Sequence, residues 1–187
     1  MIYFICAFKG EARPFIEKRK LKPCLSLPYP FYKNKDTLLL ITGMGYQNAS
    51  KATAELMQYR PPEKGDSIIN IGVCAAPEYY PIGSILIAKE LRYKKQSVKI
   101  EITISHPFKE VILKSVDTVQ NHPCDTPVDM EAFGIHNTAL AYIDSDRIFI
   151  IKVVSDHFKP KNTNIKEMVG LIKLKADEIE LALLLND

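Results

Sequence analysis

Two short stretches of the chain place acidic residues where chemistry is expected. Residues 128–136 read VDMEAFGIH and residues 152–158 read KVVSDHF, and in each we expect an acid where an apolar strand gives way to another element. An unpaired carboxylate is costly to bury, so an acid at the inner end of a core strand usually has a partner or a substrate. Asp156 follows the run RIFIIKVV of residues 147–154, which is typical of a buried strand. Open α/β sheets bind ligands at the carboxyl ends of their strands, so the sequence predicts a site around these acids.

Three further segments follow apolar strand patterns and could share that edge of the sheet. They are Glu11, the turn Thr42-Gly43-Met44-Gly45, and Gly72-Val73-Cys74. If the strands are parallel, this edge carries three carboxylates and a glycine turn whose exposed amides favour an anion or a polarised oxygen. Each feature also has a purely structural explanation. Such a turn often only connects a strand to a helix, an early helical Glu favours the helix dipole, and an Asp often caps the next element.

The elements that would position these residues alternate between strands and helices. We expect strands over residues 2–7, 30–32, 37–42, 67–73, 84–91, 98–104, 111–116 and 147–154. We expect helices over residues 12–20, from the Gly43–Gly45 turn to Pro61-Pro62, over residues 131–142, and from a capping box at Asn164 and Glu167 onward. Strands separated by helices predict an α/β fold with a largely parallel or mixed sheet.

Composition limits the classes of function. The chain has 187 residues, 47% of them hydrophobic and 25% charged, which fits one globular domain. The net charge of +3 and the short basic runs at residues 18–22 and 92–95 favour a solvated surface over nucleic-acid binding. Four widely spaced cysteines predict free thiols in a reducing, cytoplasmic setting, without a disulfide framework. No stretch predicts a membrane span or a targeting segment, and His122 and Cys124 lack the further ligands that a zinc site needs. We expect no metal and no cofactor.

Five motifs, in order, resemble the nucleoside phosphorylase and nucleosidase superfamily. This superfamily includes purine nucleoside phosphorylase, uridine phosphorylase, methylthioadenosine/S-adenosylhomocysteine nucleosidase and futalosine hydrolase. The motifs are CAFKGEA at residues 6–12, TGMG at 42–45, NIGVCAA at 70–76 with IGS at 82–84, VDMEAFG at 128–134, and VSD at 154–156. The resemblance implies one domain over residues 1–187 with a three-layer phosphorylase-like α/β fold, in which helices flank a central mixed twisted sheet.

The resemblance also implies a role for each matching residue. Asp156 is expected to protonate or hydrogen-bond the departing purine base, with Ser155 assisting and His157 touching the ligand. Met130 and Glu131 are expected to bind the ribose, with Glu131 accepting bonds from its hydroxyl groups. Glu11 stands where the hydrolytic members keep a water-activating glutamate. The Gly43–Gly45 turn and Gly72 are expected to border the nucleophile.

The same comparison favours a hydrolase over a phosphorylase. Phosphate binding normally requires arginine, and the arginines and the serine of the phosphorylase motifs are absent, with Asn70 and Val73 in two of these positions. We therefore expect a nucleosidase that acts on a nucleoside, without nucleic acid or membrane as a partner, and that forms a homodimer. A phosphate-dependent phosphorylase and a catalytically impaired nucleoside-binding protein are the alternatives.

The chain departs from the family between residues 84 and 128. Only 45 residues separate Gly83 from Asp129, and a valine stands near the position of the aromatic residue that stacks on the purine. Phe108, Phe133 or Phe158 could replace that ring, although large aromatic residues more often pack in the core. His136 is expected to have a partly exposed structural role.

Overall fold

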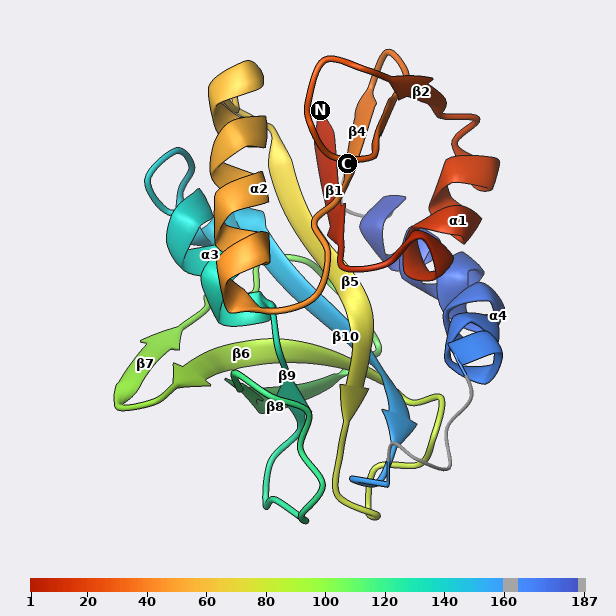
Figure 1. Ribbon diagram of the computed structural model, residues 1–187, viewed down its shortest axis with the longest axis vertical. Helices are drawn as coiled ribbons and strands as arrows, with labels where there is room; N and C mark the ends of the chain where they lie inside the picture. Colours follow the sequence, from red (N-terminus) through yellow and green to blue (C-terminus); the bar gives the residue numbers. More distant parts are fainter. Residues whose placement is uncertain (160–164, 185–187) are drawn as a thin grey trace.

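A mixed β-sheet lies between two pairs of helices (Figure 1). The computed structural model describes residues 1–159 and 165–184. In these residues the strands are β1 (Ile2–Cys6), β2 (Lys22–Cys24), β3 (Phe31–Lys33), β4 (Thr37–Ile41), β5 (Ser67–Ala75), β6 (Ile85–Tyr93), β7 (Gln96–Lys99), β8 (Lys109–Ser115), β9 (Val128–Asp129) and β10 (Ile148–Asp156). The helices are α1 (Lys9–Lys18), α2 (Tyr46–Tyr59), α3 (Ala132–Ala139), the 3-10 turn η1 (Ser145–Arg147) and α4 (Ile165–Leu184). This three-layer α/β arrangement confirms the predicted fold class.

The strands that carry most of the predicted site run parallel to one another. β1 pairs in parallel with β4 and β5, and β5 pairs in parallel with β10. β9 is antiparallel to β5 but parallel to β8, so Glu131 does not follow a strand parallel to the others. The assumption that all five segments leave parallel strands is therefore wrong for Met130-Glu131. Strands β5, β10, β6, β8 and β9 pair in succession and close a ring, which brings β9 to the same site.

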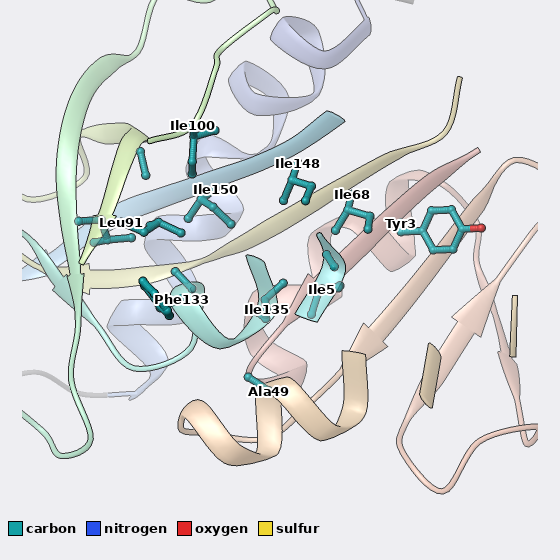
Figure 2. Close-up of a cluster of buried hydrophobic side chains, with 14 of the residues drawn as sticks. Tyr3, Ile5, Ala49, Ile68, Leu91, Ile100, Phe133, Ile135, Ile148 and Ile150 are labelled. Carbon is teal, nitrogen blue, oxygen red and sulfur yellow. The ribbon is translucent and has the colours of Figure 1, made fainter. Parts of the chain in front are cut away.

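Alternation along the strands divides the core into two layers. Tyr3, Ile5, Ile68 and Ile150 face α2 and α3, and Figure 2 shows these side chains gathered with Phe133 and Ile135 of α3. The intervening residues of the same strands, such as Phe4, Ile69 and Ile151, face α1 and α4. Phe133, Phe108 and Phe158 are at most 7% exposed and lie in the interior, so the structural explanation of these rings is favoured.

The basic run at residues 18–22 contributes to helix packing. Arg19 binds both carboxylate oxygens of Glu180 on α4, at 2.8 and 2.6 Å, and its guanidinium lies 4.9 Å from the centre of the Phe4 ring. Lys18, at the end of α1, pairs with Asp177 of α4. These contacts join α4 to α1 and give Lys18 and Arg19 a structural role.

Several predicted boundaries are wrong, for identifiable reasons. The first helix begins at Lys9 instead of Ala12 because the Glu11 carboxylate binds the amides that precede it, and it ends at Lys18 before Lys20 turns left-handed at φ 51°. The strand expected over residues 98–104 ends at Lys99. The helix expected over residues 131–142 covers only Ala132–Ala139. Strand β10 includes Asp156, which still pairs with Ala75 of β5 beyond an irregularity. The capping box at Asn164 lies outside the described residues.

Candidate active site

A cavity of about 190 Å³ opens where β1, β5 and β10 end. It brings together five of the predicted residues: Glu11, Met130, Glu131, Ser155 and Asp156. The other predicted residues, Gly43, Gly45, Gly72 and His157, are not among those that line it. The complete lining consists of Phe8, Glu11, Met44, Val73, Cys74, Ala75, Val116, Val119, Gln120, Val128, Asp129, Met130, Glu131, Ser155 and Asp156.

The carboxylate of Glu11 is held in one position by three backbone amides. Its Oε2 atom accepts hydrogen bonds from the N–H groups of Ala7 and Phe8, and its Oε1 atom accepts one from Val73, each at 3.0 Å. The side chain is only 4% exposed, and this burial raises its pKa. The nearby Lys152 and the three amides oppose that shift because they stabilise the charged form. Glu11 is thus a buried, oriented hydrogen-bond acceptor.

Gly72 makes room for Glu11 although it does not line the cavity. A Cβ atom at this position would lie 3.0 Å from Glu11 Oε1 and 3.4 Å from Lys152 Nζ. Any larger residue would therefore press on the carboxylate and the ammonium group together. The predicted importance of Gly72 has a physical explanation in this close approach.

Lys152 is the central cation beneath the cavity, and our sequence-based site omitted it. Its Nζ atom lies 2.9 Å from Asp129 Oδ2, and both side chains are almost fully buried. Although burial opposes its charge, the Asp129 and Glu131 carboxylates raise the pKa of Lys152. Asp129 is fixed further by Ser115, whose hydroxyl donates to Oδ1 at 2.6 Å. A lysine inside the apolar run RIFIIKVV was the sequence signal, since a charge there requires a partner.

Glu131 connects this charged group to the glycine turn. Its Oε1 atom accepts a hydrogen bond of 2.7 Å from the backbone N–H of Gly45. Gly45 has a φ of 95° at the start of α2, a conformation that favours glycine. Burial first, and then the charge of Asp129, raise the pKa of Glu131 to about 7. The Gly45 amide therefore holds a carboxylate of the protein itself, and Gly43 donates its N–H to the Ala7 carbonyl oxygen at 3.1 Å.

Asp156 and Ser155 form the wall of the cavity opposite β9. The Ser155 hydroxyl lies 2.9 Å from Asp156 Oδ2, and Asp156 Oδ1 accepts a bond of 3.2 Å from the Lys159 N–H. Asp156 is 8% exposed, so its carboxyl group reaches the cavity surface from a largely buried position. His157 lines an adjoining depression of about 300 Å³ instead, and its Nδ1 atom lies 2.9 Å from the Ala76 carbonyl oxygen.

The segment after β8 lines the cavity with Val116, Val119 and Gln120. Among the described lining residues, the one aromatic side chain is that of Phe8, which is 44% exposed. The predicted loss of the stacking ring thus corresponds to an aliphatic wall. His136 was expected to be partly exposed, and this was wrong: it is fully buried in α3, and neither ring nitrogen has a hydrogen-bond partner among the described residues.

Two general features bear on what the protein could bind. Within residues 1–159 and 165–184, no group of three His, Cys, Asp or Glu side chains is arranged to hold a metal ion. None of the helices in this part of the chain combines the length and the apolar character that crossing a bilayer requires.

Comparison with known proteins shows a shared fold at low sequence identity. No protein-family model matches the sequence, and no curated protein matches it. The structure is similar to the 5′-methylthioadenosine/S-adenosylhomocysteine nucleosidase of S. pneumoniae, with a TM-score of 0.80 and 16% identity over 99% of this chain and 98% of that one. A mutant of the Helicobacter pylori enzyme of the same name gives a TM-score of 0.83 with 11% identity, covering 97% of each chain. Futalosine hydrolase of Helicobacter pylori gives 0.77 with 14% identity, covering 97% of this chain and 96% of that one. These similarities confirm the predicted resemblance at the level of the fold.

Proposed function

We propose that this protein hydrolyses the N-ribosidic bond of a purine-type nucleoside, with or without a modified 5′ group, and that residues 1–187 act as one domain. The observation that carries the proposal is the convergence of Glu11, Glu131 and Asp156 on one cavity from distant parts of the chain. The structures with this fold include nucleosidases that act on methylthioadenosine, S-adenosylhomocysteine and futalosine, as their names state.

The chemistry requires groups at two ends of the breaking bond. Cleavage of the bond between C1′ and the base nitrogen passes through an oxocarbenium-like state, as in glycosidases. Asp156 donates a proton or a hydrogen bond to the base, which leaves with the bonding electrons. Glu131 accepts hydrogen bonds from the ribose hydroxyls. Glu11 takes a proton from the water molecule whose oxygen forms the new bond to C1′. General acid–base catalysis of this kind contributes roughly a hundredfold to ten-thousandfold in rate.

The charges around the cavity favour water over phosphate as the nucleophile. Within residues 1–159 and 165–184, the lining residues carry four carboxyl groups, on Glu11, Asp129, Glu131 and Asp156, and include no lysine, arginine or histidine. Lys152 lies beneath them and is already paired with Asp129 at 2.9 Å. A phosphate dianion would meet these acids without an arginine to bind it. Asn70, at the position of a phosphorylase arginine, is buried and donates to the Ile5 carbonyl group instead.

The aliphatic wall supports a second candidate, a protein on this scaffold that binds a nucleoside without cleaving it. Val116 and Val119 give a base less favourable contact than an aromatic ring would. If the base is held weakly, the acids still bind the sugar of the nucleoside. The base is then poorly positioned for cleavage, and efficient turnover is lost.

The experiment is a product assay on a panel of nucleosides: adenosine, inosine, 5′-methylthioadenosine and uridine. Release of free base is measured with and without inorganic phosphate, together with ligand-induced changes in melting temperature. We expect a purine base and free sugar without phosphate, and loss of turnover in the folded Asp156→Asn protein. Asp36→Asn, an exposed change in the turn before β4, is the matched control. Turnover only with phosphate would identify a phosphorylase, and binding without product would support the second candidate.

We also infer that the protein is a cytoplasmic homodimer. Phe8, Met44 and Val119 surround the mouth of the cavity and are 44%, 48% and 49% exposed. A second copy of the chain seated on this rim would bury these side chains and complete the cavity. Light scattering of the purified protein tests this, and a monomer at all concentrations would contradict it.

A further inference from the structure

The acids of the cavity can hold a sugar, but of these only Asp156 is assigned to the base, to which it gives one proton or hydrogen bond. The edge of the purine six-membered ring carries a donor and an acceptor, or an acceptor alone, and a charged carboxylate only accepts. The hydroxyl of Ser155 is already bonded within the protein, to Asp156 and to the Cys74 carbonyl group. Among the described side chains that line the cavity, Gln120 is the one with an N–H donor.

The segment that carries Gln120 is anchored to other parts of the fold on both sides of this residue. At one end, Asp117 Oδ1 accepts a bond of 2.6 Å from Tyr93. Tyr93 stacks on Tyr46, the first residue of α2, directly after the Gly45 amide that binds Glu131. At the other end, the Tyr79 hydroxyl donates to the Asp125 carbonyl group at 2.8 Å.

The second anchor lies on the side of Asp156. Tyr79 belongs to the segment that follows β5, and in that segment the N–H of Ala76 donates to the Asp156 carbonyl oxygen at 3.0 Å. Val119 and Gln120 therefore line the mouth between two fixed points. The segment is held on both sides of Gln120, which keeps this residue at the cavity that it lines.

The amide of Gln120 is available to a ligand. The side chain is half-buried, and within the described part of the chain it makes one hydrogen bond, from Nε2 to the His122 carbonyl oxygen at 3.4 Å, close to the limit for such a bond. Replacing this weak bond to His122 with a hydrogen bond to a ligand therefore costs little free energy. The carboxamide can present its N–H and its C=O side by side, and rotation about the last bond reverses their order.

We propose that Gln120 determines base specificity by pairing its carboxamide with the edge of the purine six-membered ring. This inference rests on the proposed function. A 6-oxopurine offers N1–H and O6, and a 6-aminopurine offers N1 and an N6–H group, so each presents a donor beside an acceptor. A purine without a substituent at C6 offers only the N1 acceptor. Bases of the first two classes are therefore preferred over the third.

The test compares inosine, adenosine and purine riboside as substrates of the wild-type and Gln120→Leu proteins. A good bidentate amide–base pair discriminates by about tenfold or more. We expect the ratio of kcat/KM for inosine to that for purine riboside to fall by about this factor in the variant, and the adenosine ratio to fall similarly. Gln58→Leu, an exposed change on α2, should leave both ratios unchanged. An unchanged ratio in Gln120→Leu, or equal losses for all three substrates, would overturn the proposal.

A binding measurement separates this inference from the proposed function. Calorimetric titration of the same proteins with hypoxanthine and with unsubstituted purine needs no turnover. A change in their Kd ratio without any cleavage of nucleosides supports the role of Gln120 and refutes the hydrolase. Cleavage with an unchanged Kd ratio refutes the role of Gln120 alone. Unaltered thermal unfolding of Gln120→Leu confirms that the variant is folded.

Discussion

Glu131 imposes a stability cost that depends on pH and can be measured directly. The carboxyl group is 7% exposed, and burial with the nearby Asp129 raises its pKa from 4.5 to about 7. The native state therefore keeps a proton that the unfolded chain releases between these two values. By linkage, this contribution to stability is fully present below pH 4.5 and is lost as pH rises through 7. Each pKa unit corresponds to about 1.4 kcal/mol, so the loss at pH 8 reaches about 3 kcal/mol.

Replacing this acid with its amide should remove the pH dependence. Glu131→Gln keeps an oxygen that can accept the Gly45 N–H and has no charge to desolvate. We expect the gain in the free energy of unfolding, relative to wild type, to be about 2 kcal/mol larger at pH 8 than at pH 5. Activity should fall at pH 8, where the wild-type group is charged and the ribose loses a charged acceptor. Urea unfolding at the two pH values, followed by circular dichroism, gives these differences.

The comparison has a matched control and a clear contrary result. Glu101→Gln changes an exposed glutamate and should not alter the pH dependence of stability. His136 also titrates differently in the two states, but it is present in every protein compared and cancels from the difference. If Glu131→Gln destabilises the protein equally at pH 5 and pH 8, the reasoning from buried charge is refuted.

Three further changes test other parts of the structure. Lys152→Met leaves Asp129 as an unpaired buried acid, and urea unfolding should show a loss of about 3–5 kcal/mol; a loss near zero contradicts the buried pair. Burial lowers the pKa of His136 to about 4, so native stability falls as pH drops from 6.5 toward 4. His136→Leu should therefore stabilise the protein by about 2 kcal/mol more at pH 5 than at pH 8 in the same assay, and no such difference contradicts the buried neutral ring. Val119→Phe restores an aromatic face, so KM for purine nucleosides should fall by about fivefold or more, and an unchanged KM argues against base contact.

Apolar runs and the strand-end rule predict much of the site. Glu11 and Asp156 are far apart in sequence, yet each follows a run of buried residues, and parallel pairing of β1, β5 and β10 brings both acids to one cavity. This inference needed only the alternation of strands and helices.

The remaining features depend on contacts that a sequence pattern does not specify. Lys152 stood out as a charge in an apolar strand, but nothing local says that its partner is Asp129. The early start of α1 follows from a side chain that binds backbone amides, which periodicity cannot report. Closure of the strand ring places β9 antiparallel to β5, and no local pattern in the sequence indicates this pairing. Gln120 lies in a loop, where no repeating pattern marks a side chain.

The position of β5 has a consequence for how the chain assembles. Asn70 pairs with Ile5 of β1 on one side and with Ile150 of β10 on the other. The edge of β5 that pairs with β10 therefore has its partner 80 residues further along the chain. During synthesis, the apolar segment SIINIGV therefore presents an unpaired edge until β10 emerges. Such edges template association between chains, so the same strand that joins the two acids is the point at which an incomplete chain is most exposed to aggregation.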